Sequence, residues 1–368
     1  MIVRFPEYKH GFRIISLALD ENTKNDLLKD CVAFLYVDEG RMILYPEETV
    51  LAADESTAAR LRQCNNYDVF ELWGTGALYR VYNNCAPDNF FFVTGKCNSN
   101  CVMCPSPDVS RREAERGSAA KLIEIATHIP TSAHHLTITG GEPFMLGEEI
   151  FEFISYLKEK FRDTEFLFLT NGRIFSVKKY LYSLFDTIPS NSTIAIPLHG
   201  STSEVHDRIT RTPGSFAQTI QGIKQLLRGN VRVEIRLVIN KLNLHDLDRI
   251  TQLIIHELPE VDYVSVISME MTGNAWVNKD AVWLPYSEAF RACRTPIRDL
   301  LENGVNVKLY NFPLCTVDRE YWPLCEKSIS PEKVRFTEEC GRCRYQRSCG
   351  GIFAGTLMLE REELKHIP

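Results

Sequence analysis

The run GKCNSNCVMC contains three cysteines, Cys97, Cys101 and Cys104, in a CxxxCxxC pattern. Thiolates are soft ligands that suit iron-sulfur clusters or zinc, and these short spacings let one loop surround one metal group at little cost in closure entropy. Three ligands leave one iron of a four-iron cluster open to bind another molecule. The alternative is a zinc site completed by a fourth cysteine or histidine, but zinc knuckles favour CxxC pairs. The pattern therefore favours a catalytic iron-sulfur centre.

The elements that must position this loop follow an alternating pattern from about residue 89 onward. Short β-branched or aromatic runs alternate with amphipathic stretches such as 151–161 and 216–227, which indicates a parallel sheet with crossover helices. Periodicity alone is compatible with an open doubly wound sheet and with a curved, incomplete barrel. In both folds, ligands bind at the carboxyl ends of the strands. The six expected strands are 89–94 (NFFFVT), 135–139 (HLTIT), 165–170 (EFLFLT), 192–197 (STIAIP), 231–239 (VRVEIRLVI) and 262–268 (DYVSVIS).

A CxxxCxxC pattern directly after the first strand of a βα core resembles the radical S-adenosylmethionine (SAM) superfamily. This resemblance implies an α/β fold with a partial (β/α)6 barrel and a [4Fe-4S] cluster bound by the three cysteines, whose open iron is chelated by SAM. It also implies reductive cleavage of SAM to a 5′-deoxyadenosyl radical that abstracts hydrogen from a substrate. The residue before the last cysteine is often aromatic in this family; here it is Met103, which can pack the same surface.

The turn after the second strand, TGGEP, resembles a second motif of the family. Gly140 and Gly141 lack a Cβ and let a ligand approach the backbone, and the Glu142 carboxylate can accept a hydrogen bond from the SAM ammonium. Each of the other candidates also has a structural interpretation, as an ordinary turn, a cap, a core hydrogen bond or a solvent-facing side chain. These further cofactor-binding candidates are Pro143, Thr170 and Asn171 in a TNG turn, His199 in PLHG, Arg236 in the fifth strand and Gly273 after the sixth.

A second group of cysteines lies near the C-terminus. Four thiolates satisfy a cluster completely, and the spacing resembles the auxiliary-cluster domain of SPASM and twitch radical SAM enzymes without the full SPASM set. We therefore expect one auxiliary [4Fe-4S] cluster, although a structural zinc site with four cysteines fits the same spacing. The expected ligands are Cys315, Cys340, Cys343 and Cys349, with Cys325 as the alternative to Cys315.

Three domains are expected along the chain. Residues 1–87 read as a small β-rich module with strands at 32–37, 42–45 and 69–82, the last interrupted by a glycine hairpin. Residues 88–282 form the expected radical SAM core. From about residue 283 the periodicity fades while proline, glycine and cysteine increase, so we expect residues 283–368 to be a loop-rich iron-sulfur domain organised by its metal.

The order of motifs between about residues 88 and 356 is most similar to the His-Xaa-Ser system radical SAM maturases. The matching segments include NFFFVTGKCNSNCVMC, ITGGEPF, FLTNG, NFPLC and CGGIF. This resemblance implies a ribosomally made precursor peptide as the substrate and a crosslink or related modification as the product. It also implies an electron donor such as flavodoxin or ferredoxin and a second radical SAM protein as partners. The N-terminal module is then a candidate for recognising the peptide or a partner.

Bulk composition excludes several other classes of protein. With 44% hydrophobic and 24% charged residues, the chain resembles neither a disordered nor a collagen-like protein. A net charge of −6 without a long basic block argues against nucleic acid as a partner. We expect neither an export signal nor a membrane span, and therefore a cytoplasmic protein whose twelve cysteines stay reduced.

Two alternative functions stay open at this point. A radical SAM enzyme that acts on a small molecule in cofactor or nucleoside biosynthesis would have the same core motifs. A non-catalytic interaction protein stabilised by two zinc sites would use the same cysteines. Iron and sulfide content separates the zinc protein from both enzymes.

Overall fold

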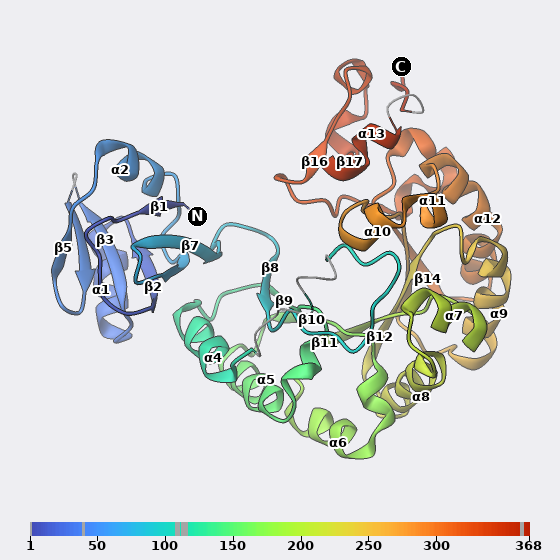
Figure 1. Ribbon diagram of the computed structural model, residues 1–368, viewed down its shortest axis with the longest axis horizontal. Helices are drawn as coiled ribbons and strands as arrows, with labels where there is room; N and C mark the ends of the chain where they lie inside the picture. The colour runs from blue at the N-terminus through green and yellow to red at the C-terminus, as the bar shows by residue number, and fades with distance from the viewer. Residues whose placement is uncertain (1, 39–40, 107–110, 112–116, 361–363) are drawn as a thin grey trace.

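The computed structural model describes the whole chain except residues 1, 39–40, 107–110, 112–116 and 361–363. Two sheets dominate the described residues, one of seven strands near the N-terminus and one of eight strands through the rest of the chain. The larger sheet curls into a crescent with helices on its convex side (Figure 1). This α/β half-barrel is the curved fold that the resemblance implied.

All neighbouring strands of the larger sheet are parallel, in the order β15-β14-β13-β12-β11-β10-β9-β8. The six strands expected from the sequence are confirmed, and β14 and β15 extend the sheet beyond them. The strands are β8 (Asn89–Phe92), β9 (His135–Thr139), β10 (Glu165–Leu169), β11 (Ser192–Pro197), β12 (Arg232–Val238), β13 (Tyr263–Ile267), β14 (Asn306–Tyr310) and β15 (Cys325–Glu326).

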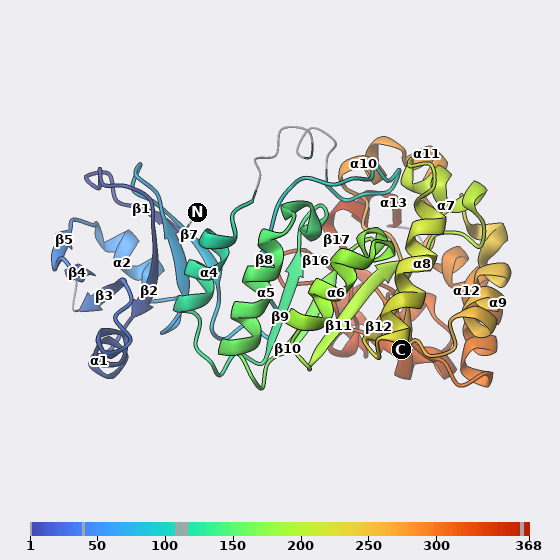
Figure 2. The same ribbon diagram turned by 90° about the horizontal axis from the view of Figure 1, so that it is seen from below.

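The convex side of the sheet carries the main hydrophobic core. Val233, Ile235 and Leu237 of β12 alternate with polar residues and are buried against the helices, as the period of two along a strand requires. Figure 2 shows α4, α5, α6 and α8 along this side. The principal helices are α4 (Ala119–His128), α5 (Glu149–Lys160), α6 (Lys178–Thr187), α7 (Ser203–Thr210), α8 (Ser215–Arg228), α9 (Leu247–Glu257) and α12 (Tyr286–Glu302). No described helix is long and apolar enough to cross a bilayer.

Sequence reasoning was wrong about the segment that follows residue 283. We expected loops there, but α12 and β14 continue the helix-strand alternation and add to the main sheet. Pro296 lies inside α12 and interrupts the apparent helical pattern in the sequence, although the helix keeps a buried apolar face. Short 3₁₀ turns and the β16–β17 hairpin (Val334–Arg335, Ile352–Phe353) do dominate the end of the chain, as does α13 (Leu357–Glu360).

The N-terminal module contains the strands expected from the sequence together with elements that it did not reveal. Its sheet has the order β1-β7-β6-β2-β3-β4-β5. The hairpin between β6 and β7 uses Gly76 at φ +78°, where a Cβ would lie 1.8 Å from the carbonyl oxygen of Phe5. The module consists of β1 (Val3–Arg4), β2 (Arg13–Ala18), α1 (Glu21–Lys29), β3 (Phe34–Asp38), β4 (Arg41–Tyr45), β5 (Thr49–Leu51), α2 (Glu55–Leu61), β6 (Val69–Leu72) and β7 (Ala77–Tyr82).

The N-terminal module packs against α4 of the half-barrel. Ser16 Oγ and His128 Nδ1 lie 2.9 Å apart in a buried contact, and Lys121 forms an ion pair with Glu71 at 2.8 Å. Lys160 Nζ donates to the carbonyl oxygens of residues 126 and 127 at 2.7 Å, so its charge lies at the end of α4. The two parts of the chain are thus joined by a buried histidine contact.

We predict that this histidine makes stability depend on pH. Burial, with Lys160 as a second cause, lowers the pKa of His128 from 6.5 to about 4. The unfolded chain therefore takes up a proton below pH 6.5 that the folded chain refuses until about pH 4. The contribution of up to about 3 kcal/mol is present above pH 6.5 and is lost as the pH falls through this window. Thermal unfolding midpoints at pH 7 and pH 5 should differ less in His128→Gln than in the wild type.

The exposed His256 of α9 provides the control for this prediction. His256→Gln should keep the wild-type difference between the two midpoints. Equal pH dependence in His128→Gln and the wild type would contradict the assignment.

Candidate active site and metal centres

The three cysteines of the CxxxCxxC pattern lie on residues 95–105, which we call the cysteine loop. It follows β8 at the carboxyl edge of the parallel sheet, where sequence reasoning placed it. Two asparagines of the α10 region (α10, Gly273–Val277) hold its backbone. Asn274 Nδ2 donates to the Cys101 carbonyl oxygen at 3.1 Å, and Asn278 Nδ2 donates to the Val102 carbonyl oxygen at 3.0 Å. Side chains far away in the sequence therefore fix the path of the loop.

The thiols of the cysteine loop are partly buried and unoxidised. Burial raises the pKa of Cys97 to about 11 and that of Cys101 to about 12, and neighbouring thiols, Cys104 among them, add to both shifts. Without metal these two groups are neutral thiols at pH 7, and metal binding must displace their protons. Cys97 Sγ also accepts a hydrogen bond from the Ser99 N–H at 3.4 Å. In the part of the chain that the structure describes, no group of three or more His, Cys, Asp or Glu side chains is arranged so that it could hold one metal ion.

Gly140 and Gly141, which we expected to let a ligand approach, are partly exposed and pack against Thr94 and the cysteine loop. A Cβ on Gly140 would lie 2.5 Å from the Thr94 carbonyl oxygen, and one on Gly141 would lie 2.4 Å from that of Lys96. The Gly141 N–H donates to the same Thr94 oxygen at 2.8 Å. These glycines therefore allow two loops to touch, and any side chain would push the cysteine loop away.

We expected the Glu142 carboxylate to accept a hydrogen bond from the SAM ammonium. In the structure this carboxylate is buried and has partners within the protein. It is 2% exposed and accepts three hydrogen bonds, from Thr170 Oγ1 (2.8 Å), Asn171 N–H (2.7 Å) and Phe144 N–H (3.2 Å). Burial raises the pKa of Glu142, and the three donors oppose this shift. Glu142 thus joins the ends of β9 and β10, while Pro143 begins the 3₁₀ turn Pro143–Leu146.

The TNG turn braces the cysteine loop from the other side. Asn171 Nδ2 donates to Asn98 Oδ1 at 2.6 Å, and Arg173 donates to the Asn98 carbonyl oxygen at 2.8 Å and to Ser99 Oγ at 3.1 Å. Thr170 Oγ1 is occupied by Glu142 and by the Gly172 N–H. Sequence reasoning missed Arg173, since its only signal is its place directly after the turn.

His199 is placed at the carboxyl end of β11 and is buried. Its backbone N–H donates to His206 Nδ1 at 3.2 Å, while its own Nδ1 is buried without a hydrogen-bond partner in the described structure. Burial lowers the pKa of His199 well below 6.5 and that of His206 to about 4, so both rings are neutral at pH 7. A neutral, incompletely satisfied imidazole at this edge of the sheet is suited to hydrogen bonding with a bound molecule.

Arg236 and Gly273 have partners that limit their expected roles. Arg236 donates to the buried Glu234 at 3.0 Å and lies over the Tyr310 ring, with its centre 5.8 Å from the ring centroid. Its charge is therefore already paired inside the half-barrel. Gly273, at φ +54°, packs against the cysteine loop, since a Cβ would lie 2.2 Å from the Pro105 carbonyl oxygen.

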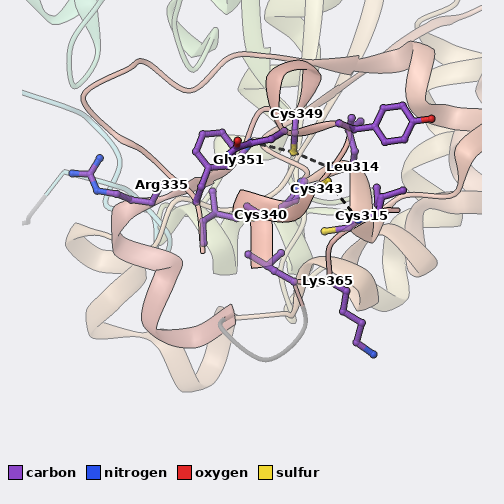
Figure 3. A pocket seen from close by; sticks show the side chains of 15 residues that line it. Leu314, Cys315, Arg335, Cys340, Cys343, Cys349, Gly351 and Lys365 are labelled. Carbon is purple, nitrogen blue, oxygen red and sulfur yellow. Dashed lines mark hydrogen bonds between the residues drawn. The ribbon is translucent and has the colours of Figure 1, made fainter. Parts of the chain in front are cut away.

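Four cysteines from the second group surround one pocket in the C-terminal part of the chain. Figure 3 shows Cys315, Cys340, Cys343 and Cys349 around it, and Cys325 is not among its lining residues. Cys325 instead begins β15 at the sheet edge. The pocket is lined elsewhere by apolar residues such as Leu314 and Ile352 and also by Arg335 and Lys365. Burial raises the pKa of Cys315 to about 11. The chain thus brings four thiols together in surroundings that suit a soft metal group.

The last residues of the chain close this pocket. The Arg344 N–H donates to the Ile367 carbonyl oxygen at 3.0 Å, and the Ile367 N–H donates to Cys343 Sγ at 3.5 Å. Leu364 is buried in the core, and His366 Nδ1 lies 2.7 Å from Glu339 Oε2. Cys349 Sγ accepts two further N–H groups at 3.4 Å. Backbone donors therefore surround the sulfur atoms, as they do around metal-bound thiolates.

The chain is similar in sequence to a known protein family and to curated proteins. Residues 91–254 match the family model for the radical SAM superfamily. The chain is 24% identical over 166 residues to AdoMet-dependent heme synthase of Methanosarcina barkeri, covering 44% of this chain and 45% of the relative. It is 28% identical over 168 residues to the antilisterial bacteriocin subtilosin biosynthesis protein AlbA of Bacillus subtilis, covering 44% and 35%. The chain thus aligns with less than half the length of either curated relative.

A solved structure shares the fold. Native anSMEcpe with bound AdoMet and Cp18Cys peptide superimposes with a TM-score of 0.52 at 11% identity, covering 76% of this chain and 91% of that one. At this identity the likeness shows the shared half-barrel and nothing about chemistry.

We predict that Glu142→Gln destabilises the protein by about 2 kcal/mol, because the amide nitrogen would face one of three donors that the carboxylate now accepts. The thermal unfolding midpoint and the iron content after reconstitution measure the effect, and both values should be lower than in the wild type. Glu148→Gln is the matched control, since Glu148 pairs with Lys179 on the surface and such pairs contribute less than about 1 kcal/mol. Equal losses in the two variants would contradict the role of Glu142.

Proposed function

Residues 91–254 form a radical SAM domain, and on this premise we propose that the chain is a SAM-cleaving enzyme that abstracts hydrogen from a ribosomally synthesised precursor peptide. The observation that carries the proposal is the cysteine loop itself. It presents three thiols at the carboxyl edge of a parallel half-barrel and is braced on both sides by hydrogen bonds from β9, β10 and α10. A loop held in this way can bind a cluster through three sulfurs without closing around a fourth ligand.

The residues present fit the cofactors that the family implies. Cys97, Cys101 and Cys104 would hold a [4Fe-4S] cluster, and the bound cluster with SAM supplies a 5′-deoxyadenosyl radical. Glu142, Thr170 and Asn171 keep the loop and its neighbours in place through main-chain and side-chain hydrogen bonds. His199, also an expected cofactor-binding residue, is buried at the same edge with its Nδ1 unpartnered.

Two observations support a peptide as the substrate. One curated relative is named for biosynthesis of the bacteriocin subtilosin. The half-barrel of this chain also keeps an exposed aromatic edge on its concave side, at Phe90 and Phe92. Within this class, we favour a precursor with His-Xaa-Ser repeats and a crosslink or related modification as the product.

A second candidate function is radical chemistry on a small molecule. The relative from Methanosarcina barkeri, which is named as a heme synthase, favours it. The zinc-stabilised interaction protein would require zinc in the cysteine loop instead of iron. Metal analysis of anaerobically purified protein separates this last alternative from both enzymes.

We also propose that Cys315, Cys340, Cys343 and Cys349 hold one auxiliary [4Fe-4S] cluster. Support comes from their position around one pocket and from the N–H groups directed at their sulfurs. A fully ligated cluster suits electron transfer, and a flavodoxin or ferredoxin would supply electrons to the enzyme. We further propose that the enzyme works with a second radical SAM protein and that residues 1–87 recognise the peptide or a partner. The proposed location is the cytoplasm.

The first functional prediction concerns the cysteine loop. Replacing Cys97, Cys101 and Cys104 together by alanine should abolish formation of 5′-deoxyadenosine under strong reduction and lower the iron content by about four atoms per chain. Chromatography of the reaction mixture and iron analysis measure the two effects. The exposed Cys85→Ala variant is the control and should behave as the wild type. Zinc in place of iron, or wild-type protein that forms no 5′-deoxyadenosine, would refute the proposal.

The second functional prediction concerns the pocket at the C-terminus. Ile367→Pro removes the N–H that donates to Cys343 Sγ, and loss of a donor to sulfur disfavours the more negative, reduced state. The auxiliary reduction potential, followed by electron paramagnetic resonance, should become more negative. Ile367→Ala keeps the N–H and is the matched control. Identical potentials in the two variants would contradict the contribution of this hydrogen bond.

A further inference from the structure

Strand β8 forms an open edge of the main sheet with two exposed aromatic side chains. It pairs only with β9 among the described strands. Phe91 packs into the core on the convex side, whereas Phe90 and Phe92 lie on the concave side and are 60% and 56% exposed. Residues i and i+2 of a strand share one face, so these two rings form an apolar pair inside the mouth of the half-barrel.

The backbone groups of the same two residues point away from β9. The Val93 N–H donates to the Thr139 carbonyl oxygen at 2.8 Å, and Phe92 lies opposite Thr139 in the register. In a parallel ladder, successive residues direct their N–H and C=O groups to alternate sides. Phe91 and Val93 therefore face β9, and Phe90 and Phe92 face outward. No described residue outside β9 forms a hydrogen bond with the backbone of Phe90 or Phe92.

The other edges of the two sheets are protected, which sets β8 apart. Proteins usually blunt edge strands by making them very short or by adding charge or proline. The opposite edge of the same sheet, β15, has only two residues, one of which is Glu326. The edges of the N-terminal sheet, β1 and β5, have two and three residues. β8 has four residues without charge or proline, so its edge is available for another strand.

The direction of β8 connects this edge to the reactive site. The chain leaves Phe92 and reaches Cys97 five residues later, so the strand leads directly into the cysteine loop. A segment paired along β8 would rise about 3.3 Å per residue toward the carboxyl edge of the sheet. Its end would arrive beside the start of the cysteine loop, at Gly95 and Lys96.

We propose that an extended segment of the peptide substrate adds to β8 as a further strand, with apolar side chains packed on Phe90 and Phe92. This inference rests on the proposed function, because it takes a peptide as the substrate. Main-chain hydrogen bonds supply affinity and fix the register, while the two rings select apolar side chains at alternate positions. The strand delivers the following residues of the peptide to the cysteine loop.

The main-chain part of the proposal is tested with N-methylated peptides. The probe is a fluorescein-labelled peptide of six His-Val-Ser repeats, and fluorescence anisotropy measures its binding to the holoenzyme. Two further peptides carry N-methyl groups on the even or on the odd residues of its central segment. Binding of one of them should weaken by about tenfold, since only alternate N–H groups meet the strand, and the other should bind like the parent. Equal binding of all three peptides, or no binding of the parent, overturns the proposal.

The side-chain part is tested with Phe90→Ser/Phe92→Ser. The variant should bind the parent peptide about tenfold or more weakly, because the apolar surface that the peptide covers is removed. Tyr182→Ser on α6 is the matched control, since Tyr182 is 58% exposed outside the half-barrel, and it should bind like the wild type. Wild-type affinity in the double variant overturns the proposal. So does sedimentation that shows a dimer in the wild type and a monomer in the double variant, because β8 would then pair with a second copy.

SAM cleavage separates this inference from the proposed function. Wild type and Phe90→Ser/Phe92→Ser should form equal amounts of 5′-deoxyadenosine without peptide, because neither ring lies in the cysteine loop. If 5′-deoxyadenosine forms and the peptide is converted while the binding results are negative, only the docking on β8 fails. If no 5′-deoxyadenosine forms in either protein, the proposed function fails, whatever the binding shows.

Discussion

The geometry of the candidate active site depends on one buried carboxylate. Glu142 has almost no contact with solvent, yet it accepts hydrogen bonds from β10 while its own backbone N–H donates to Lys96 of the cysteine loop at 2.8 Å. A buried charge of this kind is stable only when its donors are in place. Through its carboxylate and its backbone N–H together, Glu142 therefore ties three consecutive strand ends into one unit. The cysteine loop gains its rigidity from this unit.

The same constraint explains the glycines beside Glu142. For Gly140 the space that a Cβ would need is taken by the carbonyl oxygen of Thr94, and for Gly141 by carbonyl oxygens of the cysteine loop. Gly273 meets that loop from the opposite side in the same way. Glycine is thus required at these positions because the loops are in contact.

Much of the fold could be predicted from the sequence because local patterns determine it. The six central strands, the cysteine loop at a strand end and the four cysteines around one pocket all follow from periodicity or from spacing. Contacts between distant segments could not be predicted in this way. Whether Glu142 faces a ligand or the TNG turn depends on the neighbouring strand, and the choice between Cys315 and Cys325 as pocket residue depends on how the last turns fold. Helix α12 was missed because Pro296 lies inside it, and proline disfavours a helix interior. The buried apolar face of α12 keeps it helical all the same.

The two sides of the half-barrel differ in a way that bears on substrate position. Toward β12, β13 and β14, the concave face carries a paired network in which Tyr263 donates to Glu234 at 3.0 Å and Arg236 stacks on Tyr310. The polar groups on this side of the concave face are thus hydrogen-bonded or paired with one another. At the opposite edge, β8 offers apolar rings and free backbone groups. Abstraction of one chosen hydrogen requires a reacting atom held at a defined distance. In the proposed docking, pairing with β8 would set that distance in steps of one residue.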